Sequence, residues 1–178
     1  MDELKRMKHL ILVGACYLDT ILTVPRFPEE DSKLRATRVQ VRRGGNCPNS
    51  LEVLAQLVSA GPHDQSPTKL HLVSCLPDAQ AAATAEVLSS FGDSAVDIDF
   101  SHCLYRPGHD AAASSYIIRS AETGSRTIVN FNDLPEMTVG EFEKIADAFT
   151  EYGGGECWWH FEVRQVTRKL AQVSRAVS

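Results

Sequence analysis

The stretch RRGGNCPNS, residues 42–50, decides the fold of this chain. It follows residues 34–41, whose polar and apolar side chains alternate as in a strand, and it opens a helical pattern that begins at Asn46. Pro48 falls in the first turn, where proline is tolerated, and Gly61 ends the pattern. One face of this predicted helix is apolar and is formed by Leu51, Leu54, Leu57 and Val58. The stretch therefore predicts a turn from a strand into a helix.

Strand and helix patterns alternate on both sides of this turn. Residues 9–14 and 70–75 are short apolar runs that are typical of buried strands. Residues 78–91 predict a helix with Asp78 as its N-cap, and the run CWWHFE, residues 157–162, fits one more central strand. This alternation predicts an α/β fold in which helices cover a mainly parallel sheet.

Other segments predict a small sheet beside the main one. Residues 21–24 and 34–41 are strand-like and are separated by the turn-rich sequence PRFPEEDS. Residues 114–131 contain two β-rich runs around AETGS, which is the pattern of a hairpin. Two helices are predicted in the last third of the chain. Thr138 and Glu141 form a capping box for the first, and the second covers residues 165–177.

The composition is that of a single globular domain. With 178 residues, 43% of them hydrophobic and 23% charged, the chain is long enough to bury a core, and disorder is not indicated. The net charge is −5, and the basic residues are scattered along the sequence. Both properties argue against nucleic acid as the main partner.

Cysteine spacing and hydropathy argue against further classes. The five cysteines are widely spaced and form no CxxC motif, so neither a disulfide framework nor a metal site is predicted. The first 18 residues have a basic start and an apolar run, as signal peptides do, but Asp2 and Glu3 precede the run and Asp19 follows it. No apolar run approaches the ~20 residues that cross a bilayer. We therefore expect no membrane contact and a cytoplasmic location.

The strand-to-helix turn has the chemistry of a binding loop. In an α/β fold such turns lie at the edge of the sheet where ligands bind, because helix N-termini offer unpaired N–H groups there. Gly44 and Gly45 leave the backbone bare, and Asn46 and Asn49 add amides that both donate and accept hydrogen bonds. Such a mixture matches sugar hydroxyls better than a carboxylate or a phosphate. A plain capped helix after a glycine turn is the alternative interpretation.

Asp19 is an acidic residue that could belong to the same binding site. It stands near the end of the first apolar run, where its carboxylate could accept hydrogen bonds from sugar hydroxyls. Taken alone, the same residue is equally well interpreted as a solvated surface acid.

The order of these features resembles one known family. Residues 13–57, VGACYLDTILTVPRFPEEDSKLRATRVQVRRGGNCPNSLEVLAQL, are similar to the opening of the PfkB (ribokinase-like) carbohydrate kinases, and within that family to the ketohexokinases most of all. The later motifs GSRTIV, DLPEMTVGEFEKI and WWHFE match in order and spacing. The resemblance implies a ribokinase-like fold in which residues 1–178 are the N-terminal part of the kinase domain. It also implies a small β lid, with strands at about 18–42 and 113–131.

The resemblance also implies a set of site residues and ligands. The sugar, of ketohexose type, would be held by Asp19, Gly45, Asn46 and Asn49. Arg126 would contact the phosphates of ATP, a role that suits a fork-shaped guanidinium; without the resemblance it is a solvated hairpin residue. ATP and Mg²⁺ are the implied cofactors, and the lid is implied to pair two subunits as a homodimer.

The sequence departs from the family in two places. The family takes its catalytic base and its anion hole from a Gly-Ala-Gly-Asp turn, which does not occur in these 178 residues. We therefore assign no catalytic residue, expect a truncated and inactive chain, and expect most of the ATP and Mg²⁺ site beyond Ser178. The second departure is HFEVRQ, which stands where the family has HxEGRN. Glu162 and Arg164 are thus left out of the predicted site, and His160 is interpreted as a strand histidine with its hydrogen bonds satisfied.

Three hypotheses follow. The first is an ATP-dependent sugar kinase of PfkB type. The second is a catalytically silent sugar-binding or subunit-pairing remnant, which the missing Gly-Ala-Gly-Asp turn favours for these 178 residues. The third, a dinucleotide-binding domain, would need GxGxxG after the first strand, where this sequence has VGACYLD.

Overall fold

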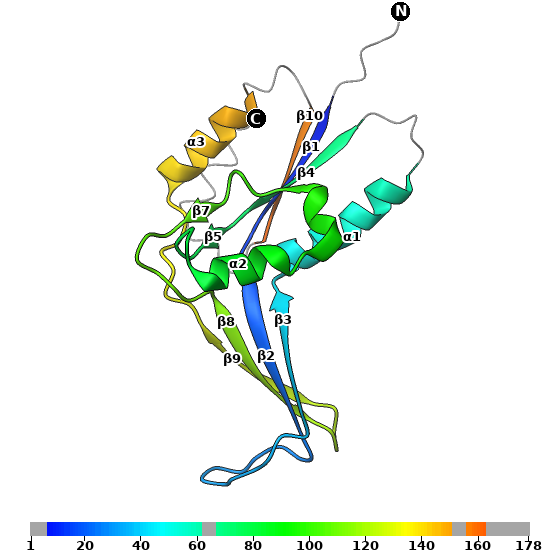
Figure 1. Ribbon diagram of the computed structural model, residues 1–178, viewed down its shortest axis with the longest axis vertical. Helices are drawn as coiled ribbons and strands as arrows, with labels where there is room; N and C mark the ends of the chain where they lie inside the picture. Colours follow the sequence, from blue (N-terminus) through cyan, green and yellow to red (C-terminus); the bar gives the residue numbers. More distant parts are fainter. Residues whose placement is uncertain (1–6, 62–66, 151–155, 163–178) are drawn as a thin grey trace, which may run out of the picture.

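The main sheet has four parallel strands in the order β10-β1-β4-β6, and Figure 1 labels the first three of them. The structure, a computed structural model, describes residues 7–61, 67–150 and 156–162. The strands are β1 (Lys8–Val13), β4 (Thr68–Val73), β6 (Ile98–Asp99) and β10 (Glu156–Phe161). The last four residues of β1, 10–13, are apolar because the strand lies between two neighbours and beneath helices on both faces. The parallel α/β fold expected from the sequence is confirmed.

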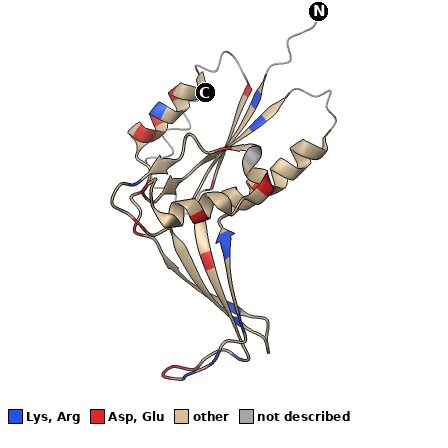
Figure 2. Cartoon of the chain, viewed as in Figure 1, with Lys and Arg blue, Asp and Glu red and all other residues tan. Residues whose placement is uncertain are grey.

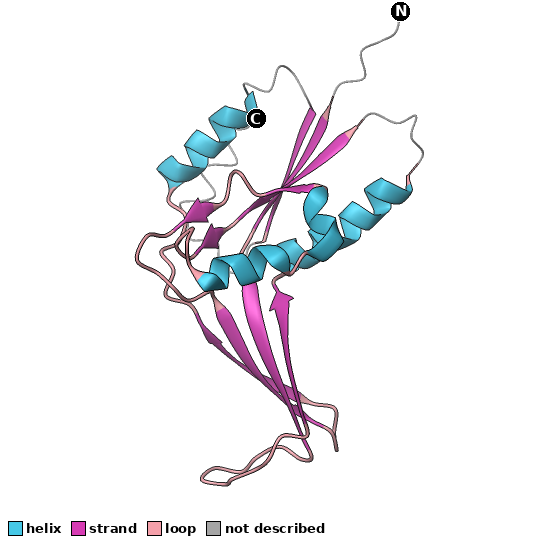
Figure 3. Ribbon diagram, in the orientation of Figure 1, coloured by secondary structure: helices cyan, strands magenta, loops and turns pink. Residues whose placement is uncertain are grey.

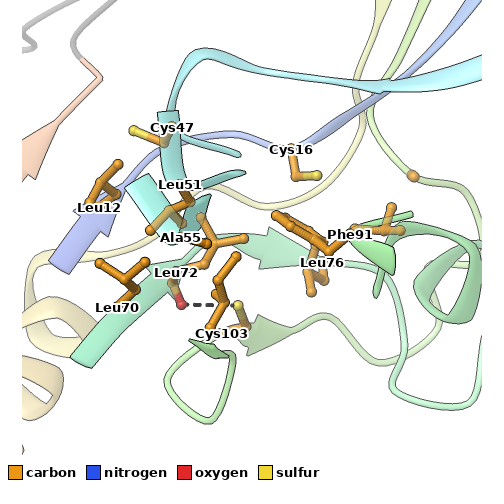
Figure 4. Packing of buried hydrophobic residues seen from close by; sticks show 13 residues of the cluster. Leu12, Cys16, Cys47, Leu51, Ala55, Leu70, Leu72, Leu76, Phe91 and Cys103 are labelled. Carbon is orange, nitrogen blue, oxygen red and sulfur yellow. Dashed lines mark hydrogen bonds between the residues drawn. The ribbon is translucent and has the colours of Figure 1, made fainter. Parts of the chain in front are cut away.

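Helices cover both faces of this sheet. They are α1 (Asn46–Ala60), α2 (Ala82–Ser89), the short 3₁₀ helix η1 (Gly92–Val96) and α3 (Val139–Thr150). One buried cluster lies under α1 and α2 and includes Leu12, Leu51, Leu70, Leu72 and Phe91 (Figure 4). The other lies under α3 and is formed by Ile11, Val13, Val73, Phe142, Ile145 and Phe149. Alternate residues of β1 thus point into two separate cores.

A second sheet extends away from the main one, and we call it the projecting sheet (Figure 3). Its strands are β2 (Tyr17–Val24), β3 (Arg38–Gly44), β8 (Ser114–Ser120) and β9 (Arg126–Phe131), in the order β3-β2-β8-β9. β2 runs parallel to β8 and antiparallel to β3, and β8 forms a hairpin with β9. The hairpin predicted over residues 114–131 is therefore confirmed. Two very short strands, β5 (Cys75–Leu76) and β7 (Leu104–Tyr105), form a separate pair.

Two predicted helices differ in detail from the structure. Leu57 and Val58 are 63% and 39% exposed, because the buried positions of α1 end at Ala55. The last turn of α1 thus lies beyond the core. α2 begins at Ala82, since the carboxylate of Asp78 accepts a hydrogen bond from the backbone N–H of Gln80 and forms a turn before the helix.

The strand predicted from CWWHFE is present, and among the described residues it lies at the end of the sheet. Within the described ranges β10 pairs with β1 on one side only, so it is the end strand of the sheet and Trp158 is 69% exposed. The helix predicted over residues 165–177 lies outside the described residues. None of the helices in those ranges has the length and apolar character needed to cross a membrane.

Candidate functional site

The two glycines of RRGGNCPNS are required by close neighbours. A β-carbon on Gly44 would lie 2.5 Å from Oδ2 of Asp19, so the carboxylate of β2 occupies the space beside the last residue of β3. Gly45 has a φ of 103° and a β-carbon there would lie 2.3 Å from the carbonyl oxygen of Ala15. A side chain at either position would displace Asp19 or the strand that leads into it.

Asn46 is hydrogen-bonded to a residue that is distant in the sequence. Its Nδ2 donates a hydrogen bond to Oε1 of Glu162, the residue directly after β10, over 2.8 Å. A β-carbon on Gly14 would lie only 2.6 Å from Sγ of Cys47 and 3.0 Å from Cβ of Glu162. The ends of β1 and β10 and the start of α1 are thus packed tightly at one edge of the sheet.

Asn49 is oriented by a buried arginine. Nη1 of Arg43 donates to Oδ1 of Asn49 over 3.1 Å, and Nη2 of the same guanidinium forms an ion pair with Glu52. The Arg43 side chain is only 4% exposed, and its guanidinium carbon lies 4.1 Å from the centre of the Phe91 ring. Arg43 therefore fixes which way the amide of Asn49 points.

The two asparagines offer complementary groups. Asn46 and Asn49 lie three residues apart on α1 and are both exposed, so they share one face of the helix. Asn46 uses its Nδ2 on Glu162, which directs its carbonyl oxygen elsewhere as an acceptor. Asn49 uses its carbonyl oxygen on Arg43, which directs its N–H groups elsewhere as donors. Among the described residues, the free carbonyl oxygen of Asn46 is an acceptor and the free N–H groups of Asn49 are donors. Together with the carboxylate of Asp19 at the same turn, they fit the hydroxyl groups of a polyol.

The two thiols near the turn, Cys16 and Cys47, are buried. Burial raises the pKa of Cys47 to about 11 and the pKa of Cys16 to about 12, so both thiols stay protonated at neutral pH. Cys47 donates its S–H to the carbonyl oxygen of Val13 over 3.4 Å. Both cysteines belong to the packing beneath the turn.

Comparison with known proteins agrees with this architecture. No family model matches the chain. Ketohexokinase of Mus musculus is 28% identical over 169 residues, which are 94% of this chain and 50% of that protein. The chain thus spans about half the length of the curated relative that it matches.

Solved structures decide the fold. Ribokinase from Giardia lamblia matches with a TM-score of 0.65 at 11% identity, over 96% of this chain and 46% of that one. Phosphofructokinase-2 from Escherichia coli, in complex with substrates and products, matches with a TM-score of 0.65 at 16% identity, over 95% and 50% of the two chains. The chain has a ribokinase-like fold. The resemblance to the PfkB kinases that was drawn from the sequence is confirmed.

The ribokinase-like fold brings together four of the five predicted binding residues. Asp19, Gly45, Asn46 and Asn49 all surround the turn from β3 into α1. Arg126 does not join them. It lies at the far end of β9 and pairs with Arg119, four positions along β8 from the Ser115 that pairs with Asp19, which is roughly 13 Å along the strands. The phosphate role of Arg126 stays a prediction.

The metal predicted for this family has no ligand set here. In the ranges that the structure describes, no three carboxylate, histidine or cysteine side chains come together as a metal site requires. The described residues therefore form no three-ligand metal site, and the magnesium ion stays a prediction of the resemblance.

His160 lies on a strand, as interpreted from the sequence. It is exposed on β10 and lines an apolar groove beside α1 together with Asn49, Leu10 and Trp158. The exposure follows from the place of β10 at the end of the described sheet, where no further strand covers it.

The sequence-based prediction of the site left out three residues that shape the turn from β3 into α1. Gly44 was noticed only as bare backbone, and Glu162 was left out because its loop differs from the family motif. The strand pattern gave no signal for Arg43. Residues 39, 41 and 43 share one face of β3, but Val39 and Val41 are exposed and only Arg43 is buried, where the strand meets α1.

Proposed function

We propose that this chain is the sugar-binding half of an ATP-dependent carbohydrate kinase of the PfkB family, with a ketohexose-type sugar as substrate. The observation that carries the proposal is the site at the carboxyl end of β1. There the carboxylate of Asp19 lies against Gly44, and the amides of Asn46 and Asn49 have fixed and opposite polarity. A sugar needs just such paired donors and acceptors.

Each residue has a distinct part in binding. Asp19 would accept hydrogen bonds from one or two hydroxyls, with the added strength of an ionised acceptor. The bare backbone at Gly44 and Gly45 would let the sugar approach the N-terminus of α1, where N–H groups are unpaired. Glu162 and Arg43 would act through the two asparagines, since each holds one amide in place.

We further propose that these 178 residues do not transfer phosphate by themselves. Phosphoryl transfer needs a base beside the acceptor hydroxyl and an anion hole for the developing charge. The family takes both from Gly-Ala-Gly-Asp, a sequence that residues 1–178 do not contain. ATP, for which Arg126 is the predicted phosphate contact, supplies the phosphoryl group in such kinases. ATP consumption that depends on an added ketohexose and is abolished by Asp19→Ala would overturn this part of the proposal.

Sugar binding is tested by the melting temperature. A sugar that binds only the folded chain raises the melting temperature, and the rise grows with the logarithm of the sugar concentration above the dissociation constant. Fructose is expected to raise it for the unaltered chain, and Asn46→Ala or Asn49→Ala to remove that rise. Gln56→Ala is the matched control, because it removes an exposed amide from the same helix away from the turn. An equal rise in all four proteins would refute the assignment of the sugar site.

The alternative is an inactive sugar-binding or subunit-pairing remnant, and one observation favours the pairing part. One face of the projecting sheet is apolar and exposed, with Val39, Val41, Tyr116, Val129 and Phe131 each more than half exposed. In this proposal the face pairs two copies as a homodimer. Val129→Lys should then shift the sedimentation profile toward monomer, and a concentration-independent monomer before substitution would exclude the pairing. The cytoplasmic location stays a prediction.

A further inference from the structure

Three arginines form one row across the projecting sheet. Arg38 pairs with Thr23, Thr23 pairs with Arg119, and Arg119 pairs with Arg126, so the four residues lie side by side on β3, β2, β8 and β9. Paired residues direct their side chains to the same face of a sheet. All three arginines are exposed, and we call them the arginine row.

The arginine row shares its face with Asp19. Asp19 and Thr23 are four residues apart on β2, and side chains of a strand return to the same face at every second residue. The row therefore lies roughly 13 Å along the strands from Asp19, on the side that carries the carboxylate. Figure 2 shows this separation, with an acidic position on β2 near the main body and basic positions farther out on the sheet.

The charges of the row are not neutralised by neighbours. Arg119 and Arg126 stand directly opposite each other, and like charges in that position destabilise a strand pair. Within the described residues, none of the three arginines has a carboxylate within 4.0 Å. The chain as a whole carries a net charge of −5, so this concentration of positive charge is local. Repulsion between these arginines destabilises the free protein, and a bound anion would remove that repulsion. We therefore expect such a row of like charges at a site that binds an anion.

We propose that Arg38, Arg119 and Arg126 form a phosphate-binding site on the Asp19 side of the projecting sheet. Three guanidinium groups in a row can each give a forked pair of N–H donors, which suits the three oxygens of a phosphate dianion better than the two of a carboxylate. The phosphate has two sources: a phosphorylated sugar whose hydroxyls reach Asp19, or the polyphosphate of a nucleotide. Only the first source rests on the proposed sugar site.

The long arginine side chains make a bridge to the sugar site possible. Gln40, Ile21 and Ile117 form the single row that lies between the arginine row and Asp19 on this face, and an extended arginine side chain is long enough to reach across one row. A hexose phosphate bound by Asp19 at its hydroxyls would place its phosphate toward the row. The site would then select phosphorylated over free ketohexose.

The test is calorimetric titration of the chain with fructose, fructose 6-phosphate, inorganic phosphate and ATP. The variants are Arg38→Gln and Arg119→Gln, with Lys144→Gln on α3 as the control that loses the same charge elsewhere. We expect each row variant to weaken phosphate-bearing ligands by roughly tenfold or more and to leave fructose unchanged. We also expect the unliganded melting temperature of Arg119→Gln to stay equal or rise, because a repulsion has been removed.

The outcomes distinguish a failure of the phosphate site from a failure of the proposed sugar site. Loss of fructose 6-phosphate binding in both row variants supports a sugar phosphate, and loss confined to ATP supports the site with a nucleotide as its source. If fructose does not bind but the row variants still lose inorganic phosphate, the sugar site fails and the phosphate site stands. Equal binding of all phosphates by the row variants and the unaltered chain overturns the inference, as does an equal loss in Lys144→Gln.

Discussion

The carboxylate of Asp19 fills the space that a side chain at residue 44 would need, since a β-carbon on Gly44 would lie 2.5 Å from Oδ2 of Asp19. The contact joins β2 to the end of β3, directly before the helix that carries both asparagines. The position of the acid therefore depends on the absence of a side chain one residue before the turn.

Gly44→Ala should weaken sugar binding because the added methyl group displaces the Asp19 carboxylate. We expect at least a tenfold loss of affinity for fructose and a loss of about 1 kcal/mol in the free energy of unfolding. Gly140→Ala is the control, since a β-carbon there meets no atom within 4 Å. It should leave affinity unchanged. Unchanged fructose affinity in Gly44→Ala would contradict the role given to Asp19.

Arg43→Met should lower both stability and sugar affinity. The substitution removes the hydrogen bond that orients Asn49 and the ion pair with Glu52, although it keeps most of the length that packs on Phe91. We expect a loss of about 2 kcal/mol in the free energy of unfolding, measured by urea denaturation. Arg42→Met, which changes an exposed side chain on the other face of the same strand, should cost no more than about 0.5 kcal/mol. Equal costs at the two positions would show that Arg43 is not a buried anchor.

Glu141→Gln should destabilise the chain at neutral pH but not in strong acid. Hydrogen bonds from Arg106 and Thr138 lower the pKa of Glu141 to about 2. The ionised form thus stabilises the fold above the unfolded pKa of roughly 4.3, and this stabilisation is lost as the pH falls toward 2. We expect a cost of about 2 kcal/mol at pH 7 that shrinks below pH 4, whereas exposed Glu143→Gln should show neither effect. A cost that is independent of pH would contradict the ionic origin.

His71 should make the fold sensitive to mild acid. It is 1% exposed, and its Nε2 lies 3.0 Å from Nδ1 of His9. Burial lowers the pKa of His71 to about 4, with Asp99 acting in the opposite direction. The unfolded chain therefore binds the proton more tightly, and stability falls as the pH drops from about 6.5 to 4, by roughly 3 kcal/mol in all.

The check on His71 is the slope of stability against pH. His71→Gln should flatten the slope between pH 4 and 6.5, whatever its effect at pH 7. Exposed His160→Gln should keep the slope of the unaltered chain. An unflattened slope in His71→Gln would place the acid sensitivity elsewhere.

Local patterns in the sequence were sufficient for several features of the fold. The capping box of Thr138 and Glu141 forms as predicted, because its hydrogen bonds join residues only three positions apart. The turn into α1 at Asn46 was also predicted, since glycine and asparagine directly before an apolar helical pattern are typical of a helix start. Such features depend only on residues that are close to one another in the sequence.

Contacts between distant residues were beyond the sequence patterns. The bond from Asn46 to Glu162 spans 116 positions, and the family motif around Glu162 was altered. The arginine row depends on the register of three strand pairs, which no single strand reveals. The end position of β10 likewise depends on which strands pair, and an apolar run such as CWWHFE reads the same in either place.

The central claim is that a ketohexose binds at the turn from β3 into α1, and amide NMR of the ¹⁵N-labelled chain during a fructose titration tests it most directly. The account predicts saturable shifts of the backbone amides of Gly45 and Asn46 and of the side-chain amide of Asn49, while Gly140 on α3 does not move. Shifts confined to residues away from this turn, or none at saturating fructose, would contradict it.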